Sequence, residues 1–253
     1  MGGTSRGGDL APEPPFVTRL LYESVEARKT IGAAPPPKDL MIHVPWNTER
    51  LLAKMADTEL PYHPVAHRPR SQGIHLSDLY HRLHPQKANT ISEDGMTAYR
   101  VGGLALEDRM ERALIELAKE DGTFVERPRE MVSPEGIICS PDLFFVTDSH
   151  LRIGETKVAW KSCYGLVVDR EGENEFPAKF DIYWTQVSGY GYVAGTTEGR
   201  IIVYFVNGDY RARTPQLLGW DLSFSHQEQA ETWDQLMGCY YEICEERAEA
   251  GNQ

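Results

Sequence analysis

Long apolar runs, paired cysteines and an excess of basic residues are all missing from this chain of 253 residues. No run reaches the roughly 18 apolar residues of a membrane-spanning helix, so we expect no association with a membrane. The Gly- and Pro-rich start of the chain, MGGTSRGGDLAPEPPF, lacks the apolar segment of a secretory signal. These absences favour a cytoplasmic protein.

The few cysteines exclude two further classes of protein. They stand at positions 139, 163, 239 and 244, and none belongs to a Cys-x-x-Cys pair. The chain therefore lacks the spacing of a zinc site built from paired cysteines, and we expect free thiols rather than disulfides. His63 and His67 have i, i+4 spacing, but Pro64 prevents the helix on which such a pair would bind zinc.

Acidic residues outnumber basic ones, with 38 Asp and Glu against 26 Lys and Arg and a formal net charge of −12. Because affinity for nucleic acid comes mostly from Lys and Arg at the phosphates, this balance argues against a protein that coats nucleic acid non-specifically. It does not exclude a local basic groove. One basic region fits a phosphate-binding surface and a solvated loop equally well, and it contains His63, His67, Arg68, Arg70, His75, His81, Arg82, His84 and Lys87.

The order of patterns predicts an N-terminal arm, residues 1–38, with a short helix at 17–29, and one α/β domain over residues 39–250. We predict helices from an Asn47 cap to Met55, at 78–83 between a Ser77 cap and Pro85, through the apolar positions 106, 110, 113, 114 and 117, and at 227–246. We predict strands at 124–131, 137–139 and 201–205, a strand extension at 164–168, a loop at 170–177 and a turn at 207–209.

The stretch with the most chemical information is residues 141–157, PDLFFVTDSHLRIGETK. Its two apolar runs around a polar turn predict a β-hairpin whose second strand is long and central in the sheet. Glu155 and Lys157 share one face of that strand because side chains alternate with period two. Antiparallel pairing brings Asp142 back beside them. Two carboxylates and an ammonium at one place suit a divalent cation with a lysine next to it.

Two other stretches carry polar groups with helical spacing. Glu107 follows Gly103-Leu104-Ala105-Leu106 on a predicted helix, and Glu111 lies one turn further on the same face. Glu107 fits a site residue, and it also fits an exposed helix glutamate. Gln186 and Tyr190 are i, i+4 neighbours on a second predicted helix, downstream of the hairpin.

Together these stretches resemble the PD-(D/E)XK nuclease superfamily, in its RecB-like and lambda-exonuclease-like branches. Pro141-Asp142 matches the PD, Glu155-Thr156-Lys157 the (D/E)XK, and Gln186-x-x-x-Tyr190 the fourth motif. The resemblance covers roughly residues 74–210. It implies a restriction-endonuclease-like core, in which a central mixed β-sheet is flanked by helices.

The resemblance also implies a division of roles within the site. Asp142, Glu155, the carbonyl of Thr156 and Glu107 would hold Mg²⁺ or Mn²⁺. Lys157 would orient the attacking water, and Gln186 would orient Lys157 or the substrate phosphate. Tyr190 and Arg100 would contact the substrate. We expect no iron–sulfur cluster, because the late cysteines are only Cys239 and Cys244, whereas cluster-bearing relatives have three there.

The implied function is a metal-dependent nuclease acting on DNA, of an exonuclease type found in recombination, repair or phage replication, in the cytoplasm of a bacterium or a virus-infected cell. The implied partners are DNA, further copies of the chain in a ring, and a single-strand-binding or annealing protein. Two alternatives stay open on the residues alone. One is an inactive nucleic-acid-binding or assembly protein on the same fold, and the other is an unrelated hydrolase that uses Glu107 and Asp142 as an acid/base pair.

Overall fold

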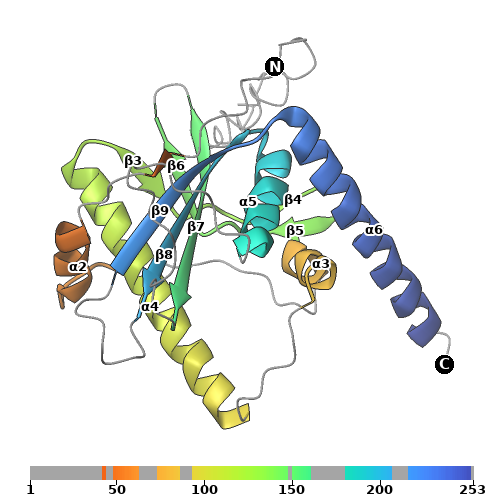
Figure 1. Ribbon diagram of the computed structural model, residues 1–253, viewed down its shortest axis with the longest axis horizontal. Coiled ribbons are helices and arrows are strands. Elements are labelled where there is room, and N and C mark those ends of the chain that lie inside the picture. The colour runs from red at the N-terminus through yellow and green to blue at the C-terminus, as the bar shows by residue number, and fades with distance from the viewer. Residues whose placement is uncertain are drawn as a thin grey trace, which may run out of the picture. The chain divides into compact units, whose positions relative to one another are not determined.

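The computed structural model describes residues 42–43, 48–62, 73–85, 93–147, 150–160, 180–206 and 216–251, all within the unit Ala34–Gln253 (Figure 1). Several predictions therefore lie outside the described residues. They are the arm at 1–38 with its helix at 17–29, the Asn47 cap, the segments at 164–168, 170–177 and 207–209, and the basic residues His63, His67, Arg68, Arg70 and Lys87.

A mixed sheet of six strands forms the centre of the described unit, in the order β1-β9-β8-β7-β6-β3. The long strand β7 is central, as predicted, and it runs parallel to β8, whereas the other neighbours are antiparallel. The strands are β1 (Ile42–His43), β3 (Phe124–Glu126), β6 (Leu143–Val146), β7 (Leu151–Ala159), β8 (Glu198–Phe205) and β9 (Gln216–Ser223).

Helices cover both faces of this sheet (Figure 1). On one face, α2 (Thr48–Ala56) and α4 (Glu93–Glu120) enclose a core in which Leu51 and Met110 meet Leu143, Ile202 and Leu217 from the strands. Side chains of a strand alternate between the faces, so the neighbours of these strand residues point to the opposite side. That side is packed by α5 (Asp181–Ala194), against which α3 (Leu76–Leu83) and α6 (His226–Gly251) lie. The fold is therefore α/β with helices on both faces of a mixed sheet.

A smaller mixed sheet has the order β2-β5-β4, with β2 at Ile74–His75, β4 at Met131–Val132 and β5 at Ile137–Cys139. It corrects one prediction, because residues 124–131 form not one strand but β3 and β4, which belong to different sheets. The break has a physical cause. Pro128 offers no N–H to a strand ladder, and Arg127 turns its guanidinium to the carbonyl of Asp108 on α4, with 3.1 Å from Nη2 to O.

The helix ends also differ from the sequence prediction. α3 begins at Leu76 with His75 as its N-cap, so Ser77 lies inside the first turn. The backbone N–H of His75 donates to Oδ2 of Asp78 at 3.0 Å, which takes the capping role that the sequence assigned to the serine. α4 and α6 are longer than predicted, and strand β9 was not predicted. Within the described ranges, no helix is both long and apolar enough to cross a membrane.

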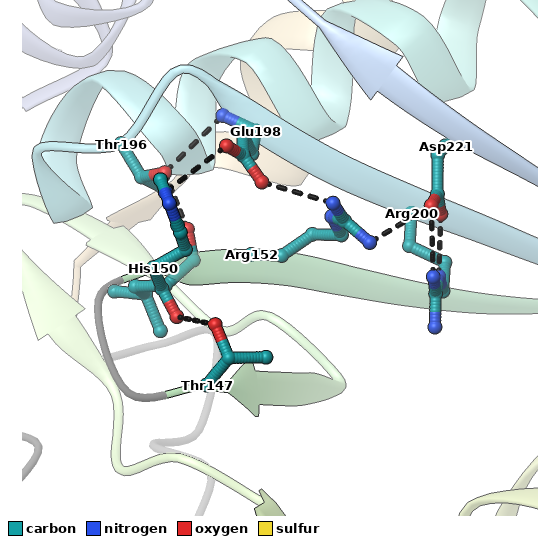
Figure 2. A network of polar contacts seen from close by, with 8 residues as sticks. Thr147, His150, Arg152, Thr196, Glu198, Arg200 and Asp221 are labelled. Atoms are coloured by element: carbon teal, nitrogen blue, oxygen red, sulfur yellow. Dashed lines mark hydrogen bonds and ion pairs between the residues drawn. The ribbon is translucent and has the colours of Figure 1, made fainter. Parts of the chain in front are cut away.

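Charged side chains link β7, β8 and β9 near the start of β7 (Figure 2). Arg152 donates to Asp221 at 2.8 Å and to Glu198 at 2.9 Å. Arg200 lies opposite Asp221 in the ladder and binds the same carboxylate from a second side, with Nε 2.5 Å from Oδ1. Since these half-buried partners come from three strands, the network favours a single register of the sheet. It lies at the opposite end of β7 from Lys157.

Candidate active site

The predicted hairpin is present and brings Asp142 to β7. Leu143 pairs with Gly154 in the antiparallel ladder, which sets Asp142 opposite Glu155. Oδ2 of Asp142 accepts hydrogen bonds from the backbone N–H of Thr156 at 2.8 Å and from its hydroxyl at 3.1 Å. The carboxylate is therefore held where β6 begins, against the part of β7 that carries Glu155 and Lys157.

Glu155 is completely buried and lies between two partners. The ammonium of Lys157 contacts its Oε1, and the side-chain amide of Gln186 donates to the same oxygen at 2.6 Å. The other oxygen, Oε2, has no hydrogen-bond partner among the residues that the structure describes. Burial of a carboxylate oxygen without a hydrogen-bond donor lowers the stability of the fold by about 1–3 kcal/mol or more. A cation bound to this atom would offset that cost.

Two carboxylates from α4 also contact β7. Oε1 of Glu107 accepts the backbone N–H of Val158 at 3.1 Å, and Oε1 of Glu111 lies 2.9 Å from the hydroxyl of Thr156, whose single hydrogen it shares with Asp142. Glu111 also pairs with Arg127, with 2.7 Å from Oε2 to Nε. Glu107 was predicted as a site residue. Glu111 was not, although its position one turn after Glu107 was the signal that it points the same way.

Burial raises the pKa of Glu155, Glu107 and Glu111, and the charge of Asp142 adds to each shift. Burial raises the pKa of Glu155 well above its usual range, Asp142 adds to the effect, and Lys157 opposes it. Burial also raises the pKa of Glu107 against the influence of Lys157. The pKa of Glu111 rises to about 8 through burial and the charge of Asp142, in spite of Arg127. Burial thus disfavours the charged forms of these carboxyls, and a bound cation would offset that cost.

Lys157 is the ammonium at the centre of these groups. Burial acts to lower its pKa, but Glu155, Asp142 and Glu107 outweigh burial and raise the pKa well above the usual value. Lys157 is therefore protonated at neutral pH and can stabilise developing negative charge. Its Nζ also lies 5.5 Å from the ring centroid of Tyr183 on α5, a residue that the sequence interpretation did not single out.

The face of α5 that meets β7 carries the predicted pair Gln186 and Tyr190. Both are buried, each with 4% exposure, and Nε2 of Gln186 lies 3.4 Å from the hydroxyl of Tyr190. The hydroxyl of Tyr190 therefore lies next to the side-chain amide of Gln186. Contact of Tyr190 with a substrate stays a prediction. Arg100 is exposed on α4, seven residues before Glu107 and on the same side of the helix. Its contact with a substrate also stays a prediction.

A cavity of about 220 Å³ opens beside Asp142 and the carboxylates of α4. Solvent and ligands can therefore reach these groups from one side. The lining residues are Leu104, Glu107, Asp108, Glu111, Arg127, Pro128, Pro141 and Asp142.

Within the described ranges, no group of three or more His, Cys, Asp or Glu side chains is already arranged to hold a metal ion. Mg²⁺ is commonly bound by only one or two protein carboxylates, with water and substrate oxygens completing its shell. Asp142, which lines the cavity, and Glu155, whose buried Oε2 has no hydrogen-bond partner among the described residues, would supply two such carboxylates.

No protein-family model and no curated protein matches this chain. Among solved structures, the chain is similar to an alkaline exonuclease from Laribacter hongkongensis, with 19% identity over 70% of this chain and 81% of that one and a TM-score of 0.44. It is also similar to a phage-related exonuclease from Haemophilus somnus 129PT, with 14% identity over 69% of this chain and 96% of that one and a TM-score of 0.41.

Proposed function

We propose that this chain is a metal-dependent nuclease that hydrolyses phosphodiester bonds of DNA, on a restriction-endonuclease-like core of the PD-(D/E)XK type. One observation carries the proposal. Asp142 at the start of β6 lies against the segment of β7 that bears Glu155 and Lys157, and Gln186 binds Glu155 from α5. These are the residue types that such a hydrolysis needs, joined by direct contacts.

In this proposal Asp142, Glu155, the carbonyl of Thr156 and Glu107 hold Mg²⁺ or Mn²⁺. A bound ion of this kind lowers the pKa of its water and neutralises charge on the phosphate. Hydrogen bonds within the protein orient the carboxylate ligands. The N–H and hydroxyl of Thr156 hold the carboxylate of Asp142, the amide of Gln186 holds that of Glu155, and the N–H of Val158 holds that of Glu107.

Lys157 has the electrostatic role. Its protonated ammonium lies among the carboxylates, where it can orient the attacking water and stabilise the charge that builds up on the phosphate in the transition state. In this proposal the lysine contributes a positive charge beside the carboxylates.

We further propose an exonuclease of recombination, repair or phage type that acts as a ring of several copies, together with a single-strand-binding or annealing protein. These finer statements come from the motif resemblance. A ring is compatible with the acidic balance of the chain, since basic residues can line its channel while the exterior stays acidic. Light scattering that shows a monomer at working concentration would remove the ring from this proposal.

The test is cleavage of labelled linear duplex DNA and of covalently closed circular DNA, with Mg²⁺, Mn²⁺, Ca²⁺ or EDTA. We expect cleavage of the linear DNA with Mg²⁺ or Mn²⁺, none with EDTA, and no nicking of closed circles. Cutting of the circles would replace the exonuclease by an endonuclease. DNA binding without cleavage under every condition would favour the inactive binding protein, and cleavage in EDTA would exclude the metal mechanism.

A further inference from the structure

The Lys157 ammonium has an aromatic neighbour in addition to its carboxylates. Its Nζ lies 5.5 Å from the ring centroid of Tyr183, within the range over which an ammonium is attracted to the face of an aromatic ring. Tyr183 is half-buried, and burial raises the pKa of its hydroxyl, so the ring stays neutral near neutral pH. Nothing in the proposed chemistry assigns this residue a role.

The position of Tyr183 on α5 follows from helix geometry. Tyr183, Gln186 and Tyr190 are spaced by three and four residues, so they form one stripe of the helix. That stripe faces β7, where Gln186 donates to Glu155. The two members of the Glu155–Lys157 pair are therefore contacted by neighbouring turns of the same helix, the carboxylate by an amide and the ammonium by an aromatic ring.

The ring of Tyr183 packs against an aromatic cluster of the core. The ring centroid of Phe180 lies 5.3 Å from that of Tyr183. Phe180 is itself buried against Trp220 of β9 at 5.8 Å and Phe205 of β8 at 6.4 Å. The position of the Tyr183 ring is thus set by packing that does not involve the charged groups, as a rigid support of an active-site side chain requires.

Such a support has a clear purpose at Lys157. The lysine side chain is long and flexible, and Glu155, Asp142 and Glu107 all attract its ammonium. An ammonium drawn fully toward Asp142 or Glu107 would occupy the space in which a cation and a phosphate are proposed to bind. Its direct contact with Glu155 keeps it on the α5 side, and attraction to the ring of Tyr183 adds to that contact.

We propose that Tyr183 is a positioning residue for Lys157, and that its ring, not its hydroxyl, holds the ammonium. This inference rests on the proposed function, because it concerns the lysine to which that function assigns the transition-state charge. Together with Glu155, the ring keeps the ammonium on the α5 side, so the positive charge is in its working position before substrate arrives.

The experiment compares Tyr183→Phe, which keeps the ring, with Tyr183→Leu, which removes it. In single-turnover cleavage we expect the Phe variant to stay within about twofold of the parent and the Leu variant to lose about tenfold or more, the scale of one desolvated cation–π contact. DNA affinity in Ca²⁺ stays unchanged in both. Equal losses in the two variants would overturn the proposal, because the hydroxyl and not the ring would then matter.

A double-mutant cycle shows whether the ring acts through the lysine. In a Lys157→Ala background, Tyr183→Leu should cause no further loss of rate. The same loss in both backgrounds would mean that the ring supports the fold or another group, and the proposal would be wrong. Tyr183→Met, a flexible apolar replacement of similar length, is the second variant to be made where Leu prevents folding, and it should show the same loss.

A second readout does not depend on cleavage. In protein made with ¹³C-labelled lysine, the resonance of the Lys157 side chain is identified by its absence in Lys157→Ala. The ring current of Tyr183 should shift this resonance, and the shift should persist in Tyr183→Phe and vanish in Tyr183→Leu. If the resonance is shifted but the protein cuts no DNA, the proposed function is wrong and the contact stands. If the resonance is not shifted in a protein that does cut DNA, only the contact is wrong.

Discussion

The side-chain amide of Gln186 donates a hydrogen bond to Oε1 of Glu155 over 2.6 Å, and both side chains are buried. This contact joins α5 to the central strand at the carboxylate that the site depends on. Gln186→Ala removes the donor and leaves the buried carboxylate held by Lys157 alone. We expect a fall in single-turnover cleavage of about tenfold, on the scale of one lost hydrogen bond to a charged group. A rate equal to the parent's would show that the amide has no part in orienting Glu155.

The Lys157 variant separates catalysis from binding. Lys157→Ala removes a charge whose role is assigned to the transition state, so turnover should fall by about two to four orders of magnitude. DNA affinity measured in Ca²⁺ should hardly change, since one lysine is a small part of the phosphate contacts. Lys119→Ala is the matched control, because Lys119 lies exposed on α4 and pairs with Glu116. Near-parent cleavage by Lys157→Ala would reduce the Glu-x-Lys string to a coincidence.

Asp142→Asn tests the metal ligand without disturbing the hairpin. The carbonyl oxygen of an asparagine can still accept the N–H of Thr156, which the carboxylate now accepts at 2.8 Å, so the thermal unfolding curve should match the parent's. Loss of the charge should abolish cleavage and weaken Mg²⁺ binding. Asp234→Asn on the exposed side of α6 provides a control for the same chemical change. Full activity in Asp142→Asn is incompatible with the proposed site.

Metal affinity should depend on pH. The raised pKa values of Glu155 and Glu107 mean that these carboxyls keep their protons to a higher pH than usual, and Glu111 does so up to about 8. Binding of Mg²⁺ must then displace protons, so affinity falls as the pH falls through these pKa values. Calorimetry of Mg²⁺ binding in two buffers with different protonation enthalpies should give different heats. Identical heats would mean that no proton is released and that these carboxyls are already ionised.

A glycine in the hairpin is required for packing. A Cβ on Gly154 would lie 2.5 Å from Cε2 of Phe145 and 2.9 Å from Cβ of Leu143. Gly154→Ala should therefore lower the free energy of unfolding by about 1–3 kcal/mol, measured by urea denaturation. On α6, a Cβ on Gly238 would meet nothing within 4 Å, so Gly238→Ala should raise stability by about 0.5–1 kcal/mol. A stabilised Gly154→Ala would contradict the register of β6 and β7.

Local periodicity was enough to predict several parts of the site. The hairpin pattern placed Asp142, Glu155 and Lys157 together, and helical spacing placed Gln186 and Tyr190 on one face. These relations hold within one strand pair or one helix, where the backbone repeat alone decides which side chains share a face. The roles of these residues in the site came from the motif resemblance. The central position of β7 followed from the continuation of its strand pattern beyond Lys157.

Local pairs of residues can thus be predicted from the sequence, whereas the contacts between distant segments depend on tertiary packing. Glu111 reaches Thr156 across 45 residues of sequence, and Tyr183 reaches Lys157 because the packing of α5 on β7 brings the two together. The same packing divided residues 124–131 between two sheets, with Arg127 turned to α4. A residue repeat specifies the face of an element, but which faces meet depends on the burial of the whole core, which no short window of sequence contains.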